Sequence, residues 1–173
     1  QINHAIQMCN AGILATQQIQ SILQDELSNQ LSLELQSAPP MSADPEEKHL
    51  KKMLMWLQKG ADPRCPINHG HSYPIHLATH KGYHPVVAEI CRKSPQQANQ
   101  PDGKKNTPLH FAVCSESLET LRVIAPFTHR SVNYQNWRGE TPLGGLKGKP
   151  APFILSAKRI LQVERYRDFP DSD

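Results

Sequence analysis

The stretch that decides the fold of this chain is a short phrase that occurs three times. It reads Tyr73-Pro74-Ile75-His76-Leu77-Ala78, then Thr107-Pro108-Leu109-His110-Phe111-Ala112, and then Thr141-Pro142-Leu143. The three prolines are spaced 34 residues apart. A fixed period of this length is typical of a solenoid, in which each repeat buries its apolar face only against its neighbours.

The phrase also predicts how each helix begins. Thr107 and Thr141, with Tyr73 in their place in the first copy, stand at the N-cap position. Proline then fills the first helical position, where a backbone amide has no intrahelical partner. The small Ala that closes the phrase allows close packing of the helix that follows.

These residues resemble the ankyrin repeat, whose signature is T-P-L-H-x-A on a period of about 33 residues. Gly82 matches the turn between the two helices of a repeat, and Gly60-Ala61-Asp62-Pro63 matches the segment after a second helix. The resemblance covers roughly residues 47–165. It implies an all-α solenoid of helix–turn–helix units with β-turn fingers, in which the phrase histidines His76 and His110 bond the backbone of a neighbouring finger.

The expected units follow the phrase. A partial first repeat has a helix over 44–59, with Asp44 as N-cap, Pro45 in the first position and Glu47 completing a capping box. The full repeats place helices at 73–82 and 85–93, and at 107–115 and 118–125. The last unit begins at Thr141-Pro142, but Gly144-Gly145 weakens its first helix. A closing helix is expected over 153–165, with a frayed tail over 168–173.

Residues 4–36 contain no proline and carry an apolar residue every fourth position, which predicts an amphipathic helix that breaks near Gly12. The stripe comprises Ile19, Leu23, Leu27, Leu31 and Leu35, widened by Ile22. It indicates either a helix that caps the first repeat or a surface for dimerisation or a separate partner. We therefore divide the chain into an N-terminal helical segment and linker (1–43), a solenoid (44–167) and a tail (168–173).

Composition excludes several classes of protein. The 173 residues carry a formal net charge of only +3, which does not favour nucleic acid as a partner. No apolar run reaches the roughly 18 residues of a membrane span, and the start shows no signal peptide. The chain begins at Gln1 rather than Met, as an excised fragment would. Cys9, Cys65, Cys91 and Cys114 show no paired spacing, so we expect reduced thiols and a cytoplasmic protein.

The resemblance also implies where a partner would bind, namely at the finger tips and the exposed edge of the first helices. The residues at those positions are His69, His71, His80, Lys81, Lys104, Lys105, Asn106, Cys114, Trp137, Arg138, Glu140 and, beyond them, Lys149. This set is more basic than the chain as a whole, which favours a partner segment with acidic character. Lys105 stands where a turn glycine is usual, so the shape of that finger is a question for the structure.

Trp137 is the most informative of these residues, because Trp and Arg are over-represented among residues that dominate binding energy. The alternative is that Trp137 folds back onto Tyr134 and packs the finger.

The sequence points to no catalytic machinery and no cofactor. No phosphate loop, nucleophile elbow or zinc-protease motif appears. A zinc site was considered because several potential ligands lie close together in sequence: Cys65, His69, His71, His76, His80 and His84. His76 is already assigned to the phrase and no C-x2-C pair supports the site, so we predict no metal.

Two functions fit these observations. The first is a non-catalytic module that binds a segment of another protein, as a monomer unless the N-terminal helix pairs. The second is a targeting or substrate-recruitment domain of a larger enzyme, or a bacterial effector of the ankyrin type that acts in the cytosol of a host cell.

Overall fold

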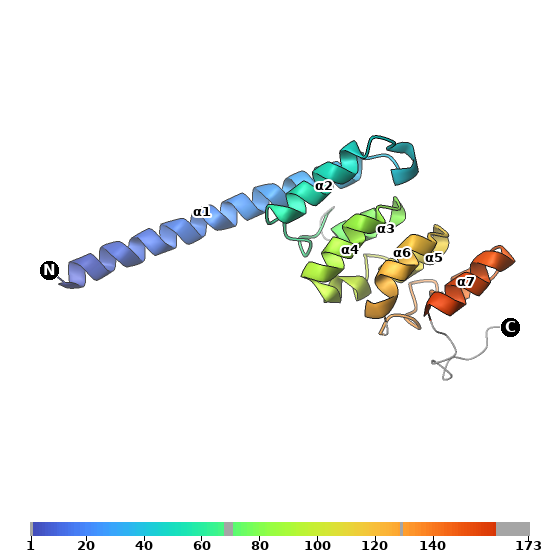
Figure 1. Cartoon of the computed structure of the whole chain (residues 1–173). Helices are drawn as coiled ribbons and strands as arrows, with labels where there is room; N and C mark the ends of the chain where they lie inside the picture. Colours follow the sequence, from blue (N-terminus) through green and yellow to red (C-terminus); the bar gives the residue numbers. More distant parts are fainter. Residues whose placement is uncertain (1, 68–70, 129, 162–173) are drawn as a thin grey trace.

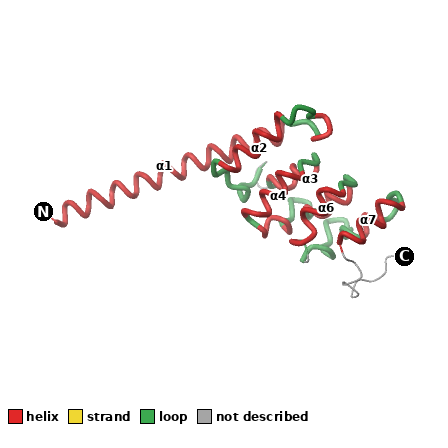
Figure 2. Tube along the Cα trace, viewed as in Figure 1, coloured by secondary structure: helices red, strands yellow, loops and turns green. Residues whose placement is uncertain are grey.

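The structure is a computed structural model that describes residues 2–67, 71–128 and 130–161. Within these ranges the chain is helical, with no strand beyond one antiparallel bridge between Ile67 and Ser72 (Figures 1 and 2). The α-helices are α1 (Ile2–Ser37), α2 (Lys48–Gln58), α3 (Pro74–His80), α4 (His84–Lys93), α5 (Pro108–Cys114), α6 (Leu118–Ile124) and α7 (Ala151–Leu161). Short 3-10 turns lie at η1 (Met41–Ala43), η2 (Pro95–Asn99), η3 (Ala125–Phe127) and η4 (Gly144–Leu146).

The helices stack in two rows, as the 34-residue period predicts. The inner row consists of the C-terminal part of α1, then α3, α5 and η4, and the outer row consists of α2, α4, α6 and α7. Successive elements contact each other within each row, and α1, α3 and α5 contact α2, α4 and α6 as partners in the same repeat. This is the nearest-neighbour arrangement of a solenoid, and it confirms the all-α ankyrin fold.

The core lies between the two rows. Ile75 and Leu109, 34 residues apart, are both fully buried, as are Val86 and Leu121 of the outer row. Leu77 and Phe111 also share a repeat position, and both are only partly buried. Position 75/109 therefore belongs to the core, whereas position 77/111 lies at its margin on the inner face.

The first layer of the solenoid includes the end of α1. Leu27, Leu31 and Leu35 are buried against α2 and α3, while Ile19, Ile22 and Leu23 are more than half exposed. The apolar stripe thus caps the first repeat over its last three members only. The expected break at Gly12 is wrong: α1 runs unbroken from Ile2 to Ser37 and extends well beyond the solenoid (Figure 1).

Polar contacts fix α1 on the solenoid. Gln24 Nε2 donates to the carbonyl of Gly60, Ser28 Oγ accepts from the Asp62 amide at 2.9 Å, and Glu34 pairs with His49 at 2.7 Å. The first of these contacts is at Gln24, so the helix preceding it is not held by the rest of the described chain.

The start of α2 differs from the expectation. The helix begins at Lys48, and Glu47 precedes it with φ of 54°, so Pro45 and Glu47 do not occupy the predicted first-turn and capping-box positions. Asp44 still caps the helix, because its buried carboxylate accepts the backbone amides of Lys48, His49 and Leu50. The carboxylate reaches these amides from further back because the chain makes a turn at residues 45–47.

The last unit is degenerate, as its glycines predict. Its inner helix is reduced to the single turn η4, whose entry is held by a hydrogen bond from the Gly144 amide to Thr141 Oγ1 at 3.0 Å. The closing helix α7 begins at Ala151, two residues before the expected start, and buries Phe153, Ala157 and Leu161. Its expected continuation to residue 165 and the tail over 168–173 lie outside the described residues.

Candidate protein-binding face

Two successive β-turn fingers are held by equivalent hydrogen bonds, the second finger over residues 102–106 and the third over residues 136–140. Asp102 Oδ1 accepts the backbone amides of Lys104 and Asn106. Asn136, 34 residues later, accepts those of Arg138 and Glu140 in the same way. A short side chain that accepts hydrogen bonds from two following backbone amides stabilises a turn. Each finger is therefore stabilised by contacts within itself.

The fingers also share a left-handed residue. Gly139 has φ of 75°, and Lys105 at the equivalent position has φ of 60°. Lysine therefore adopts the conformation that the turn requires, and the second finger keeps its shape despite the missing glycine. This conformation strains the backbone of Lys105, because at a positive φ its Cβ atom lies too close to the following carbonyl oxygen.

The fingers are joined side by side through their backbones. The Gly103 amide donates to the carbonyl of His71 at 2.7 Å, and the Trp137 amide donates to the carbonyl of Lys104 at 3.1 Å. A Cβ atom added to Gly103 would lie 2.9 Å from His71 Nδ1, so the exposed His71 side chain would have to move. The predicted residue His71 thus contacts the second finger, while His69 lies outside the described residues.

Four exposed residues at these tips form what we name the finger-tip patch. They are Lys104, Lys105, Trp137 and Arg138. Trp137 has 70% of its surface exposed, whereas Tyr134 has 36% of its surface exposed. The alternative in which Trp137 packs down into the finger does not fit this exposure. The patch combines one large aromatic ring with three cationic side chains.

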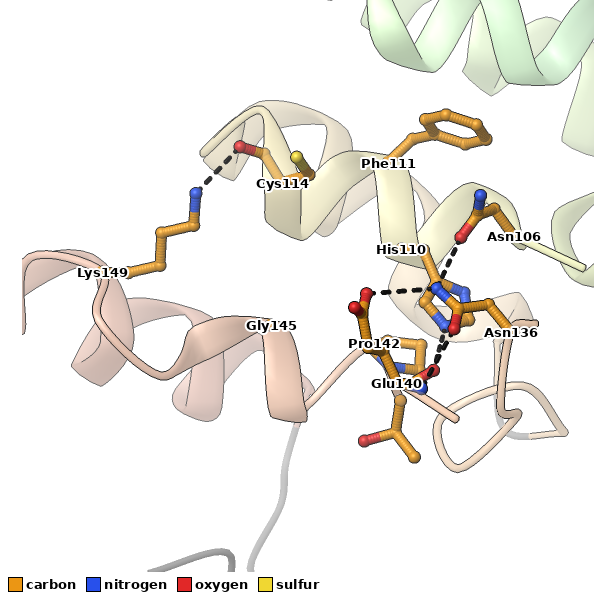
Figure 3. A pocket seen from close by; sticks show the side chains of 10 residues that line it. Asn106, His110, Phe111, Cys114, Asn136, Glu140, Pro142, Gly145 and Lys149 are labelled. Atoms are coloured by element: carbon orange, nitrogen blue, oxygen red, sulfur yellow. Dashed lines mark hydrogen bonds between the residues drawn. The ribbon is translucent and has the colours of Figure 1, made fainter. Parts of the chain in front are cut away.

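Next to the patch, a cavity of about 270 Å³ opens between the second full repeat and the last unit (Figure 3). We name it the Gly145 pocket. Figure 3 shows Phe111 and Cys114 on one side and Gly145 on the facing element. Its lining comprises Asn106, His110, Phe111, Cys114, Asn136, Glu140, Thr141, Pro142, Gly145 and Lys149.

The pocket lies where the last repeat departs from the pattern of the others. Leu77, Phe111 and Gly145 are spaced 34 residues apart and occupy the same position in their repeats. The third copy has no side chain at that position, and its helix has shrunk to η4. A Cβ atom at Gly145 would lie 3.2 Å from Val113 Cγ1, whereas the ring of Phe111 meets His76 and His80 of the preceding repeat. The sequence shows this glycine, but not that a cavity opens beside it.

Amides and a carboxylate give the pocket its polar end. Asn136 Nδ2 donates to Asn106 Oδ1 at 2.9 Å and to Glu140 Oε2 at 3.3 Å. The predicted residues Asn106, Cys114 and Glu140 therefore meet at one cavity, together with Phe111 and Asn136, which sequence reasoning missed. The 34-residue match between Asp102 and Asn136 was the available signal for Asn136.

The phrase histidines have the structural role implied by the resemblance. His76 Nδ1 accepts the Tyr73 amide at 2.9 Å, and its Nε2 lies 2.6 Å from the carbonyl of Gln100 in the next finger. His110 repeats both contacts, with the Thr107 amide and the carbonyl of Glu140. Because a backbone amide can only donate, Nδ1 is the acceptor and Nε2 carries the proton. Burial lowers the pKa of both imidazoles and favours this neutral form.

Two of the predicted basic residues serve the scaffold rather than the surface. Lys81 Nζ donates to the carbonyls of Leu35, Gln36 and Ala38 at the end of α1. Lys149, two repeats further on, donates to the carbonyl of Cys114 at the end of α5 and lies 3.5 Å from Glu116. Each lysine thus supplies donors to the unpaired carbonyls of a helix C-terminus. The ammonium groups of Lys81 and Lys149, which were expected on the binding face, are thus engaged by these carbonyls.

His80 remains on the inner face. It is exposed, and its ring meets Phe111 edge-on with 6.1 Å between centroids. The inner face therefore runs without interruption from His80 over Phe111 to the Gly145 pocket.

The cysteines are all free thiols, and they differ in environment. Cys9 and Cys114 are exposed, whereas Cys91 is buried, and this burial raises the pKa of its thiol to about 12. Among residues 2–67, 71–128 and 130–161, no three His, Cys, Asp or Glu side chains come together as metal ligands would. Because His69 is not among these residues, the absence of a metal site stays a prediction. Within the same ranges, no helix has the length and apolar content needed to cross a membrane.

Comparison with known proteins agrees with the geometry. The family described as "Ankyrin repeats (3 copies)" matches residues 43–143, which is more than half of the chain. An ankyrin repeat protein of Rickettsia bellii (strain RML369-C) is 27% identical over 137 residues, which cover 75% of this chain. The chain spans 57% of that relative's length. Proteins of this kind are typically non-catalytic modules that bind other proteins. With its repeated phrase, two-row stack and finger-to-helix histidine bonds, the chain belongs to the ankyrin repeat family.

Proposed function

We propose that this protein binds an extended, acidic segment of another protein across the finger-tip patch and the Gly145 pocket. The observation that carries the proposal is the exposure of Trp137, which is 70% accessible on a finger that is hydrogen-bonded internally and to the preceding finger. A large aromatic ring held in water by a fixed scaffold offers binding area at little entropic cost.

The charge of the patch supports the acidic character of the partner. Lys104, Lys105 and Arg138 are exposed, and no ion pair joins their side chains to an acid within the described residues. Three cations close to one aromatic ring attract carboxylates and speed association with an acidic segment. Arg138 can also hold a carboxylate through two parallel hydrogen bonds.

The Gly145 pocket supports a second contact. Its apolar wall is Phe111, and its polar end presents the amides of Asn106 and Asn136. A bound segment would place an apolar side chain against Phe111 while its backbone meets the amides. The patch would then give the complex its charge preference, and the pocket would fix the register of the segment.

A capture experiment with matched variants tests this proposal. Trp137→Ala should weaken binding of the captured partner by roughly 2 kcal/mol, because truncation of a central anchor residue has about this cost. Leu155→Ala is the control, since Leu155 is similarly exposed at 62% but lies on α7. A partner that is lost with Leu155→Ala as readily as with Trp137→Ala would rule out the patch as its site.

The acidic character is tested by charge reversal. Lys104→Glu with Lys105→Glu should slow association severalfold and reduce its dependence on salt. Lys51→Glu with Lys52→Glu removes the same charge from two adjacent exposed lysines of α2 and should leave both unchanged. Equal effects of the two double variants would mean that only net charge matters.

A second candidate is that the solenoid recruits substrates or host partners for a longer protein. The observation that favours it is the relative from Rickettsia bellii, of which the chain spans 57%. In this case the same face would bind its partner in the host cytosol, and a neighbouring part of the protein would act on it. Activity measurements on the complete reading frame, with and without residues 44–161, would test this role.

A further inference from the structure

We propose that the projecting part of α1 pairs with the same segment of a second copy, as an antiparallel two-stranded coiled coil over residues 2–23. The two solenoids would then lie at opposite ends of the paired helices. This inference is independent of the proposed function, because it concerns residues that do not touch the binding face.

The first argument is the state of the helix itself. From Ile2 to Leu23, α1 makes no hydrogen bond to the rest of the described chain, and its side chains are exposed throughout (Figure 1). The segment includes Asn3, Asn10, Gly12 and Thr16, which are poor helix formers. Helices in proteins obtain most of their stability from packing an apolar face. An isolated arm of this composition therefore calls for a partner.

The second argument is the pattern of one face. Positions 2, 6, 9, 13, 16, 20 and 23 follow alternating steps of four and three, which is the spacing of a two-stranded coiled coil. We name these positions the seam. They hold Ile2, Ile6, Cys9, Ile13, Thr16, Gln20 and Leu23. The four large apolar residues among them are 78%, 52%, 56% and 56% exposed, in chain order.

Charge decides what kind of partner fits. Residues 2–24 contain no Asp, Glu, Lys or Arg, and the first charged residue of the helix is Asp25. Such a helix offers nothing to a charged partner, and it lacks the basic residues that hold interfacial helices on a membrane. Two copies of this segment would not repel each other, because it contains no Asp, Glu, Lys or Arg. A second copy also supplies an apolar stripe of matching length.

The solenoid decides the orientation. The seam continues directly into Leu27, four residues after Leu23, and Leu27 is buried against the solenoid on the same face. In a parallel pair, both solenoids would lie at the same end of the paired helices. Each solenoid would then occupy the face of its own helix along which the partner helix must run. In an antiparallel pair, Ile2 of each arm lies beside the other copy's Gln24, where contact with the solenoid begins.

The size of the contact sets the expected strength. The paired arms would be about 33 Å long. Eight large apolar side chains, four from each copy, would each bury roughly 100 Å². With the polar seam residues and their flanks, the total falls near the lower end of stable interfaces, which is about 1,200 Å². We therefore expect a dimer that dissociates at micromolar concentrations.

Sedimentation of the whole chain over a range of concentrations tests the pairing. In the antiparallel register Ile13 faces Ile13 of the second copy, so Ile13→Glu should raise the dissociation constant more than tenfold by opposing two carboxylates. The control is Leu14→Glu, because Leu14 is equally exposed at 59% but points away from the seam. It should stay within about twofold of the wild type. A chain that remains monomeric at several hundred micromolar (about 100-fold above the expected constant) would overturn the proposal, as would equal behaviour of the two variants.

Two further variants test the orientation. Ile6 faces Gln20 of the other copy, so Ile6→Glu should weaken the dimer and adding Gln20→Lys should restore it by forming an ion pair. Cys9 lies within one residue, about 1.5 Å along the axis, of Thr16 of the other copy, so Thr16→Cys should give an oxidised dimer that Cys9→Ser abolishes. A parallel pair would instead cross-link through Cys9 alone in the wild type, and this result would overturn the antiparallel arrangement.

Discussion

Lys105 and Gly139 share one backbone conformation at equivalent positions of two neighbouring fingers, with φ of 60° and 75°. The same hydrogen bonds surround both residues, from the turn-forming Asp102 in one finger and Asn136 in the other. The finger shape is thus a property of the turn and its acceptor side chain, and lysine is held in it at a cost in backbone strain.

The first prediction concerns this strain. Lys105→Gly should raise the free energy of unfolding by about 0.5–1 kcal/mol, because glycine adopts a positive φ without a Cβ clash. Gly139→Ala should lower it by about 1 kcal/mol. A Cβ atom at Gly139 meets nothing within 4 Å, so this loss comes from the backbone alone. Urea unfolding measures both, and destabilisation by Lys105→Gly would contradict the strain.

The second prediction separates the two parts of α1. Removing residues 1–23 should leave the melting temperature of the solenoid unchanged at sub-micromolar protein, where the proposed dimer dissociates. Removing residues 1–37 should lower it strongly, because Leu50, Met53 and Leu57 lose the layer that covers them. Thermal denaturation followed by circular dichroism gives both values. Equal melting temperatures for the two truncations would mean that the end of α1 does not cap the first repeat.

The third prediction concerns pH. Burial lowers the pKa of His76 and His110 in the folded state below the unfolded value of about 6.5. The unfolded chain therefore binds more protons in this range, so stability is complete above about pH 6.5 and falls as the pH decreases toward the lowered values. Protonation would also place an Nδ1 proton against a backbone amide. Urea midpoints measured from pH 7.5 to pH 5 should decrease, and a His76→Gln, His110→Gln double variant should show a shallower decrease.

The fourth prediction tests the lysine that holds the end of α1. Lys81→Met keeps the aliphatic stem but leaves three helix-end carbonyls without their common donor, and should lower stability by about 1–2 kcal/mol. Lys104→Met, at the finger tip, should change stability by less than about 0.5 kcal/mol. If the two substitutions have equal effects, Lys81 does not serve the scaffold.

The sequence by itself determined the repeat and everything that follows from one unit or from its contact with the next. The helix starts at Pro74 and Pro108 and the weakening of the inner helix at Gly144 and Gly145 were predicted from local capping and glycine content. The histidine bonds to the next finger were implied by the resemblance to ankyrin repeats, in which neighbouring units stack. These signals repeat at a fixed spacing and need no knowledge of distant residues.

Tertiary structure alone decided the rest. The stripe of α1 is continuous in sequence, but the solenoid is long enough to cover only its last three leucines. Lys81 looks like an exposed cation, but the end of α1 reaches its ammonium group from 43 to 46 residues away. The Gly145 pocket lies between the second full repeat and the shortened last unit. In each case the outcome depends on which surface meets which other surface, and a single chain's periodicity does not specify that.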